Sequence, residues 1–199
     1  GTGANVGNGG TTGAVEVTSG VEHTVSETAG TDTNLANYVT VIGGDCASNG
    51  KITLAVGTSK TCTITNTRKT LLTVNKVLVP GTDPGLFNLQ IDGSTAGTGA
   101  NVGNGGTTGA VEVTAGVEHT VSETAGTGTS LANYVSVIGG DCASNGTITL
   151  AVGTSKTCTI TNSRLPTLTV NKVLVPGTEP GLFNLKIDGS TKVTDVSNG

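Results

Sequence analysis

The amino-acid sequence predicts an all-β fold built from tandem β-sandwich repeats of about 96 residues. The chain is rich in valine, isoleucine and threonine, which favour strands, and its 32 glycines favour the turns between strands. The same text also occurs twice: GTGANVGNGGTTGAVEVT starts at Gly1 and Gly97, CTITN at Cys62 and Cys158, and LTVNKVLVPGT at Leu72 and Leu168. A period of this length is too long for a solenoid unit and matches one domain of immunoglobulin size.

Composition and charge limit the classes of function. The net charge is -4 and there is no basic cluster, so no nucleic-acid partner is expected. No apolar run reaches the roughly 18 residues of a membrane span, so none is expected in this segment. Only 2% of the residues are aromatic, and the apolar residues are small aliphatics. Such a thin core predicts that each repeat needs additional covalent fastening.

The phase of the repeat predicts three parts. Residues 71–164 form one complete repeat, residues 1–67 the back part of a preceding repeat, and residues 168–199 the front part of a following one. The joint at residues 164–167 contains a proline, which predicts a stiff spacer. The chain is either a window on a longer repetitive polypeptide, which we favour, or a subunit whose front strands complete the next subunit. Both interpretations predict a filament whose partners are neighbouring repeats or subunits, arranged head to tail.

The four cysteines form two equivalent pairs, each inside one repeat: Cys46 with Cys62, and Cys142 with Cys158. There is no CxxC and no histidine at metal-ligand spacing, so no zinc or other metal is expected. A disulfide within each repeat is predicted, which requires an oxidising compartment and contributes about 3 kcal/mol in the chain-entropy model. The alternative is four buried free thiols in a cytosolic protein.

Strand alternation places three polar residues on faces that are otherwise apolar. Lys76 shares its face with Leu72, Val74 and Leu78, Glu123 with Val117, His119 and Val121, and Asn162 with Cys158 and Ile160. A single buried lysine or glutamate is costly, but three polar residues that converge would account for one another.

These segments resemble a known family. TLTVNKV at the start, HTVSETAG in the middle, and TCTITNTR or TCTITNSR at the end resemble the prealbumin-like fold. This is the SpaA and Cna-B type of Ig-like repeat in bacterial cell-surface, pilus and adhesin proteins. The resemblance covers the whole repeat and implies a Lys76–Asn162 isopeptide bond that Glu123 assists. In the partial repeats it implies that Glu27 and Asn66 await a lysine, and that Lys172 awaits an asparagine.

The implied bond has a sound physical basis. Burial among aliphatic side chains is expected to lower the pKa of Lys76 and leave a nucleophilic amine, and folding supplies the proximity to the amide. The result is one self-modification that needs no cofactor. The sequence departs from the family because the usual aromatic residues around the site are mostly missing, and because the disulfide could have taken over the fastening. In the alternative interpretation Lys76 reaches solvent past a strand end, while Glu123 and Asn162 bond turn backbone.

Other polar residues are interpreted as structural. His23 and His119 are expected to pack in the core or at an edge, because no partner is spaced for metal binding. The glycine-rich segments are expected to be turns, since no helix pattern or GK[ST] follows them. The acidic residues next to glycine or proline are expected to form turns: Asp45, Asp83, Asp92 and Asp141.

The sequence therefore predicts a structural repeat of an extracellular filament, stalk or adhesin shaft at a bacterial cell surface. The alternative is an extracellular module that binds a carbohydrate or another cell through its glycine-rich and asparagine-rich loops. An enzyme is the third choice, because the chain has no Ser-His-Asp set, no Cys-His pair with a free thiol and no paired carboxylates on one predicted loop.

Overall fold

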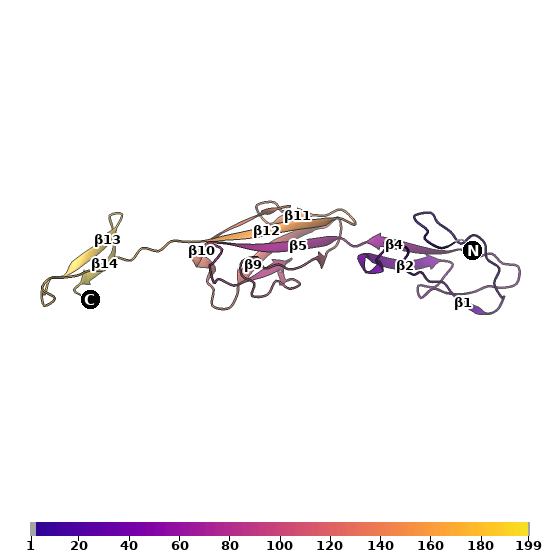
Figure 1. Ribbon diagram of the computed structural model, residues 1–199, viewed down its shortest axis with the longest axis horizontal. Coiled ribbons are helices and arrows are strands. Elements are labelled where there is room, and N and C mark those ends of the chain that lie inside the picture. Colours follow the sequence, from indigo (N-terminus) through magenta and orange to yellow (C-terminus); the bar gives the residue numbers. More distant parts are fainter. Residues whose placement is uncertain (1–2, 199) are drawn as a thin grey trace. The chain divides into compact units, whose positions relative to one another are not determined.

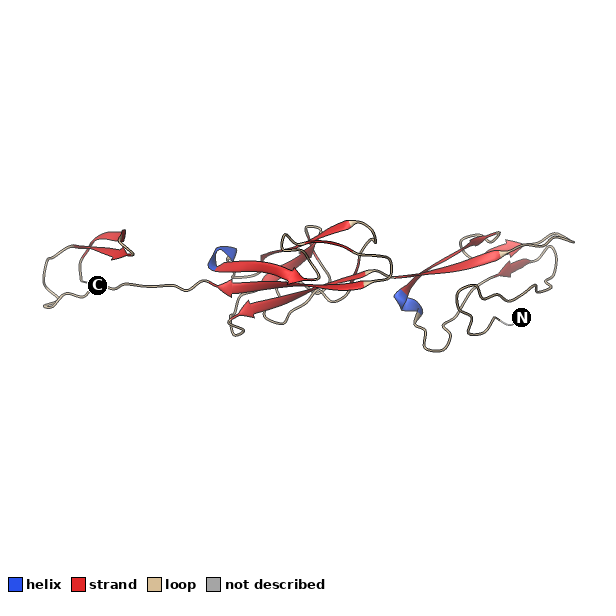
Figure 2. Cartoon of the chain, turned by 90° about the horizontal axis from the view of Figure 1, so that it is seen from above, coloured by secondary structure: helices blue, strands red, loops and turns tan. Residues whose placement is uncertain are grey.

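The computed structural model describes residues 3–198, and nearly all of its regular structure is β-strand. Figure 2 shows the strands in red and two short helical segments in blue. The chain divides into two compact units, Gly1–Arg164 and Leu165–Gly199. The prediction of an all-β class is confirmed.

The first part of the chain contains two small antiparallel sheets. Strand β1 (Glu22–Thr24) pairs with β3 (Lys51–Thr53), and β2 (Tyr38–Gly44) pairs with β4 (Cys62–Arg68). The 3-10 helix η1 (Leu35–Asn37) precedes β2, and the Asn34 side chain caps it. Each of these sheets has only two strands, so neither can enclose a core by itself.

Residues 71–164 form two four-stranded sheets (Figure 1). The first has the order β10-β12-β5-β8, from Tyr134–Gly140, Ser155–Arg164, Leu71–Val79 and Val111–Glu112. The second has the order β11-β9-β6-β7, from Thr147–Thr149, Glu118–Ala125, Phe87–Ile91 and Ser94–Thr95. The 3-10 helix η2 (Leu131–Asn133) precedes β10. Of these eight strands, β7 and β8 are two-residue edge pairings.

The core lies between these two sheets, which gives the arrangement of a β-sandwich. Its members are almost completely buried: Leu72, Val74, Cys158 and Ile160 from one sheet, and Leu89, Ile91, Val121 and Ile148 from the other. The predicted alternation of β5 is confirmed, since every second residue from Leu72 to Leu78 is buried. The inner face predicted for Val117, His119, Val121 and Glu123 is wrong at Val117, because this residue precedes β9 and is exposed.

The first and last strands of this sandwich, β5 and β12, lie side by side and run parallel (Figure 1). Their register places Lys76 opposite Ile160 and Leu78 opposite Asn162. Alternate residues of a strand share a face, so Lys76 and Asn162 occupy the same inner face of neighbouring strands, two positions apart.

Both predicted disulfides are present, Cys46–Cys62 and Cys142–Cys158. Just before the second disulfide, β10 ends at Gly140, which has a φ of 77° and where a Cβ would lie 2.6 Å from the Thr157 carbonyl oxygen, so this position requires glycine. The alternative of four free thiols is wrong. The disulfides fit an extracellular or secreted protein.

The second unit contains one antiparallel hairpin, β13 (Phe183–Ile187) with β14 (Ser190–Val196). Asp188 and Gly189 connect the strands with positive φ values of 51° and 76°, as a two-residue hairpin turn requires. In residues 3–198 no helix is both long enough and apolar enough to cross a membrane.

Candidate functional site

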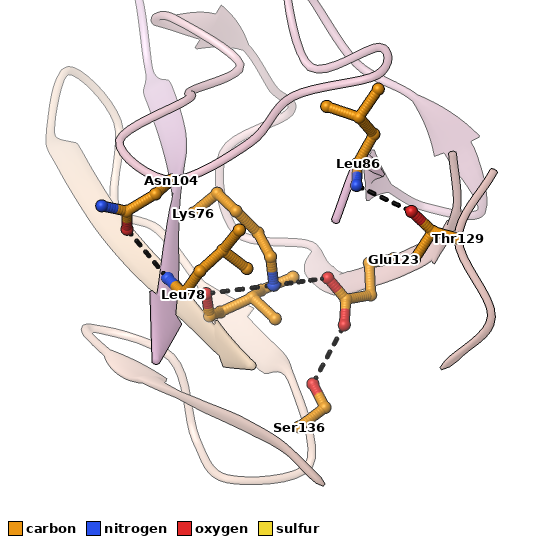
Figure 3. Close-up of polar contacts among 8 residues, drawn as sticks. Lys76, Leu78, Leu86, Asn104, Glu123, Thr129 and Ser136 are labelled. Carbon is orange, nitrogen blue, oxygen red and sulfur yellow. Dashed lines mark hydrogen bonds and ion pairs between the residues drawn. The ribbon is translucent and has the colours of Figure 1, made fainter. Parts of the chain in front are cut away.

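Lys76 is completely buried at the middle of β5, and its ammonium group faces the space between the two sheets (Figure 3). The Nζ atom donates hydrogen bonds to Glu123 Oε2 at 2.8 Å and to the Ile160 carbonyl oxygen at 3.4 Å. The alternative in which Lys76 reaches solvent past a strand end is therefore wrong.

The environment of Lys76 favours its neutral form. Burial lowers the pKa of Lys76 below the ordinary lysine value, although the hydrogen bond and the charge of Glu123 oppose that shift. A lysine with a lowered pKa is a better nucleophile, because a larger fraction of it is unprotonated at neutral pH.

Glu123 comes from the opposite sheet, on β9, and its side chain is almost fully buried. Its second oxygen, Oε1, accepts a hydrogen bond of 3.1 Å from the Ser136 hydroxyl on β10 (Figure 3). Ser136 is the cross-strand partner of Asn162, so the serine holds the carboxylate on the side of the site where Asn162 lies. Glu123 therefore contacts the lysine with one oxygen and faces the neighbourhood of the asparagine with the other.

Asn162 is completely buried on β12, and its side chain is unsatisfied. Neither Oδ1 nor Nδ2 has a hydrogen-bond partner within residues 3–198. Burying an amide without partners costs about 1–3 kcal/mol, and such groups are rare in folded proteins. The alternative in which Asn162 bonds turn backbone is therefore wrong, and its burial needs another explanation.

Two aromatic side chains enclose the site, which corrects the expectation that aromatic residues are mostly missing there. The Lys76 Nζ lies 4.3 Å from the centroid of the Phe87 ring, which is completely buried. The Tyr134 ring packs edge-on against Phe87 at 5.2 Å. The complete repeat has only this one phenylalanine and this one tyrosine, and both lie at the site. Low aromatic content concealed the fact that they are concentrated here.

A hydrogen-bonded cluster holds the hydroxyl end of Tyr134. Tyr134 donates its hydroxyl proton to Asp83 Oδ1 at 2.7 Å, and Arg164 donates to Asp83 Oδ2 at 3.0 Å. These donors, together with the Gly85 amide, lower the pKa of Asp83 although its burial acts in the opposite direction. Asp83 is thus a turn residue, as predicted, that also orients Tyr134 against the site.

The equivalent site in residues 3–68 has the acid and the amide but no lysine. There Asn66 Nδ2 donates to Glu27 Oε2 at 2.9 Å. Thr40 stands at the position of Ser136, and its hydroxyl lies 2.6 Å from Asn66 Oδ1 and 3.2 Å from Glu27 Oε1. The two copies differ in the partner of the glutamate. Without a lysine, Glu27 Oε2 accepts a hydrogen bond from the Asn66 amide; with a lysine, Glu123 Oε2 accepts from Lys76, and the Asn162 amide has no partner.

Lys172 lies in the second unit, and within residues 165–198 its side chain contacts neither an acid nor an asparagine side chain. Its Nζ lies 4.3 Å from the centroid of the Phe183 ring and donates to the Val173 carbonyl oxygen at 2.8 Å. The spacing from lysine to ring equals that of Lys76 and Phe87, so the front part of the repeat keeps this arrangement outside a complete sandwich.

His119 is a buried core histidine, as predicted, with an acidic partner that the sequence did not reveal. Its Nδ1 lies 2.7 Å from Asp92 Oδ2, and its Nε2 lies 2.8 Å from the Thr114 carbonyl oxygen. Both partners are acceptors, so the protonated ring, which has two donors, satisfies both contacts. The hydrogen bond to Asp92 and the Thr114 carbonyl raise the pKa of His119, and the same contact lowers that of Asp92.

The pKa of His119 is higher in the folded chain than in the unfolded chain, where it is about 6.5, so protonation stabilises the fold. This stabilisation is fully present below about pH 6.5 and is lost as the pH rises through the folded-state pKa. Asp92 has a lowered pKa, so its contribution to stability is lost at the acid end, as the pH falls below about 4. Thermal unfolding of the wild-type chain should show a higher midpoint at about pH 5.5 than at about pH 8.5. The His119→Gln variant should lose that difference; an unchanged difference would assign it to other groups.

No group of three or more His, Cys, Asp and Glu side chains in the described part of the chain is arranged to hold a metal ion. No protein-family model, no curated protein sequence and no solved structure matches the chain.

Proposed function

We propose that the chain is a structural segment of an extracellular filament, stalk or adhesin shaft, built from prealbumin-like Ig-type repeats. In this proposal an isopeptide bond between Lys76 and Asn162 locks the complete repeat. The near-identical repeats support a spacer role, because copies of one domain in tandem extend a chain without adding a new site. The thin aliphatic core of the complete repeat, its disulfide, and the equivalent disulfide in residues 3–68 support a role that demands durability outside the cell.

The observation that carries the proposal is the unsatisfied, fully buried amide of Asn162. It lies on the inner face next to the strand of a buried lysine whose ammonium contacts a buried glutamate. Each of the three groups is costly in an apolar interior when it stands alone. A covalent amide between Lys76 Nζ and Asn162 Cγ would remove the buried lysine charge and the unsatisfied asparagine amide group. Glu123 would carry the protons of that reaction, so one bond accounts for the burial of all three residues.

The chemistry follows from the contacts. Glu123 takes one proton from the Lys76 ammonium across the 2.8 Å contact, and the amine attacks Cγ of Asn162. The new C–N bond forms as the bond from Cγ to Nδ2 breaks, while Glu123 gives its proton to the leaving nitrogen. The carboxylate then takes the second proton from the new amide. The products are ammonia, a neutral amide and a protonated carboxyl group, and the packed sandwich supplies the proximity.

Intact-mass measurement tests the bond. With the disulfides reduced, we expect the Lys172→Ala chain to be lighter than its sequence mass by one ammonia, lost when Lys76 forms the bond. Asn162→Asp in the same background should be lighter by one water instead, because a carboxyl group loses water when it forms the amide. A digest should contain one branched peptide that joins the segments around Lys76 and Asn162.

Three variants in the same background make the result specific. Lys76→Ala and Asn162→Ala should each have their full sequence mass, and Glu123→Gln should form the bond slowly or not at all, because the proton carrier is gone. If the folded Lys172→Ala chain keeps its full sequence mass, the bond does not form and the proposal of a covalent lock is wrong.

A further inference from the structure

The Ser136 hydroxyl lies at the candidate site but takes no part in the proposed proton transfers. It donates to Glu123 Oε1 at 3.1 Å, and Figure 3 shows Lys76 at the other oxygen of that carboxylate. The register of β10 and β12 places Ser136 directly opposite Asn162. The Cβ atoms of such cross-strand partners are about 4.5–5.5 Å apart, so the hydroxyl lies near the asparagine amide as well as the carboxylate.

The equivalent hydroxyl in the other copy, that of Thr40, shows which atoms this position can reach. Thr40 stands opposite Asn66 in the register of β2 and β4. Its hydroxyl lies 2.6 Å from Asn66 Oδ1 and 3.2 Å from Glu27 Oε1. A hydroxyl at this position of the strand can therefore donate to the amide oxygen or to the carboxylate.

The amide oxygen of Asn162 needs such a donor during the reaction. Its Oδ1 is buried and has no hydrogen-bond partner within residues 3–198. When the Lys76 amine attacks Cγ, the carbonyl π electrons move onto this oxygen, and an unpaired negative charge is very costly in an apolar interior. A hydrogen-bond donor held next to a developing oxyanion lowers that cost and speeds the reaction.

We propose that the Ser136 hydroxyl is the donor that stabilises this oxyanion, a catalytic role that rests on the isopeptide bond of the proposed function. Before the reaction, Glu123 carries the negative charge and the hydroxyl donates to it. When Glu123 takes a proton from Lys76, the carboxylate loses its charge and charge develops on Asn162 Oδ1. Hydrogen bonds to ionised acceptors are roughly twice as strong as neutral ones, so the hydroxyl turns from Glu123 to Asn162.

Ser136 acts only as a hydrogen-bond donor, and the atoms and electrons balance without it. The lone pair of Lys76 Nζ forms the bond to Asn162 Cγ, and the carbonyl π pair moves onto Oδ1. That pair re-forms the carbonyl as the bond from Cγ to Nδ2 breaks, and Glu123 delivers the proton with which Nδ2 leaves as ammonia. Ser136 keeps its own proton throughout. A threonine can donate in the same way, which fits the presence of Thr40 in the other copy.

The rate of ammonia loss tests this role. Full-length Lys172→Ala chains assembled from synthetic peptides in acidic denaturant have never folded, so they carry no bond, and transfer to a folding buffer starts the reaction. Samples are stopped with acid, reduced and weighed. Ser136→Ala should lose ammonia about 10²-fold more slowly than the parent chain. This is the lower end of the range for loss of one oxyanion donor, because Ser136 is exposed and water can replace part of its function.

Three controls make the rate specific to the hydroxyl. Ser136→Thr keeps the hydroxyl and should react at close to the parent rate. Thr40→Ala removes the equivalent hydroxyl at the site without a lysine and should leave the rate unchanged. In the unreactive Lys76→Ala chain, Ser136→Ala should leave the thermal midpoint unchanged, because the side chain is exposed. A lower midpoint would assign the slow reaction to poorer folding and overturn the catalytic role.

The pH separates a donor to the oxyanion from a residue that only holds Glu123. Burial lowers the pKa of Lys76, so far more of its amine is neutral at about pH 9.5 than at about pH 7, without help from Glu123. The oxyanion forms at both pH values, so the rate factor between Ser136→Ala and its parent should persist. A factor that shrinks at the higher pH would show that Ser136 acts only through Glu123.

The parent chain distinguishes failure of this inference from failure of the function on which it rests. If the folded parent never loses ammonia, the covalent lock itself is wrong. If the parent loses ammonia and Ser136→Ala does so at the same rate, the lock stands and the catalytic role of Ser136 is overturned.

Discussion

Replacing Asn162 by alanine is expected to lower the free energy of unfolding of the central sandwich by about 4 to 5 kcal/mol. The proposed bond to Lys76 closes nearly the whole domain into one loop, and a cross-link of that span restricts the unfolded chain by about this amount in the chain-entropy model. Denaturant unfolding of the wild-type and variant chains, both as monomers in the Lys172→Ala background, measures the difference. The exposed Asn66 supplies a matched control, since Asn66→Ala should leave the central transition unchanged.

The opposite sign is expected without the bond, which makes the measurement decisive. An unlinked Asn162 is a buried amide with neither atom paired, and its removal relieves a cost of about 1–3 kcal/mol. A stability that stays the same or rises in Asn162→Ala would therefore contradict the covalent lock. It would leave Lys76 and Glu123 as a buried ion pair with no chemical product.

Strand alternation and cysteine spacing sufficed to predict much of the site. A period of two places Lys76, Glu123 and Asn162 on inner faces, and the structure buries all three nearly completely. Both disulfides follow from cysteine pairs that recur within the repeat. These inferences succeed because they depend on local periodicity and on repetition, both of which can be read directly from one sequence.

Contacts across the sheets could not be predicted in the same way. Asp92 meets His119 because β6 and β9 pair with Ile91 opposite Val121, a register that the sequence does not reveal. Phe87 and Tyr134 lie far apart in sequence and meet only when the two sheets pack. Tertiary packing decides which strands lie opposite one another. The low number of aromatic residues along the chain therefore led to the wrong expectation that the site has few of them.

The different strand content of the repeated segments has the same cause. Residues 168–175 have the β-propensity of residues 72–79, and their sequence is the same. Among the described residues only 72–79 form a strand, because there β12 is the neighbouring strand that accepts their hydrogen bonds. Propensity therefore predicted where strands are possible, and the presence of a partner determined where they form.

The disulfide and the proposed bond connect different strands of the sandwich, so the disulfide cannot replace the bond. Cys142–Cys158 closes a local loop between β10 and β12, with a sequence separation of 16. Lys76–Asn162 would join the first strand to the last, the two strands through which tension along the chain enters and leaves the sandwich. These strands are parallel neighbours, so tension shears them, and a bond between them would carry the load while the intervening residues stay folded.

Single-molecule pulling on the wild-type chain, held at its two ends, should therefore show no extension from the central sandwich. Asn162→Ala should add roughly 250 Å when that sandwich opens, which is the stretched length of the released chain outside the disulfide loop. Replacing Cys142 and Cys158 by serine should add roughly another 50 Å in the Asn162→Ala chain and nothing in the chain with the bond intact, where that loop carries no load. Equal extensions for wild type and Asn162→Ala would show that tension does not pass through a Lys76–Asn162 bond.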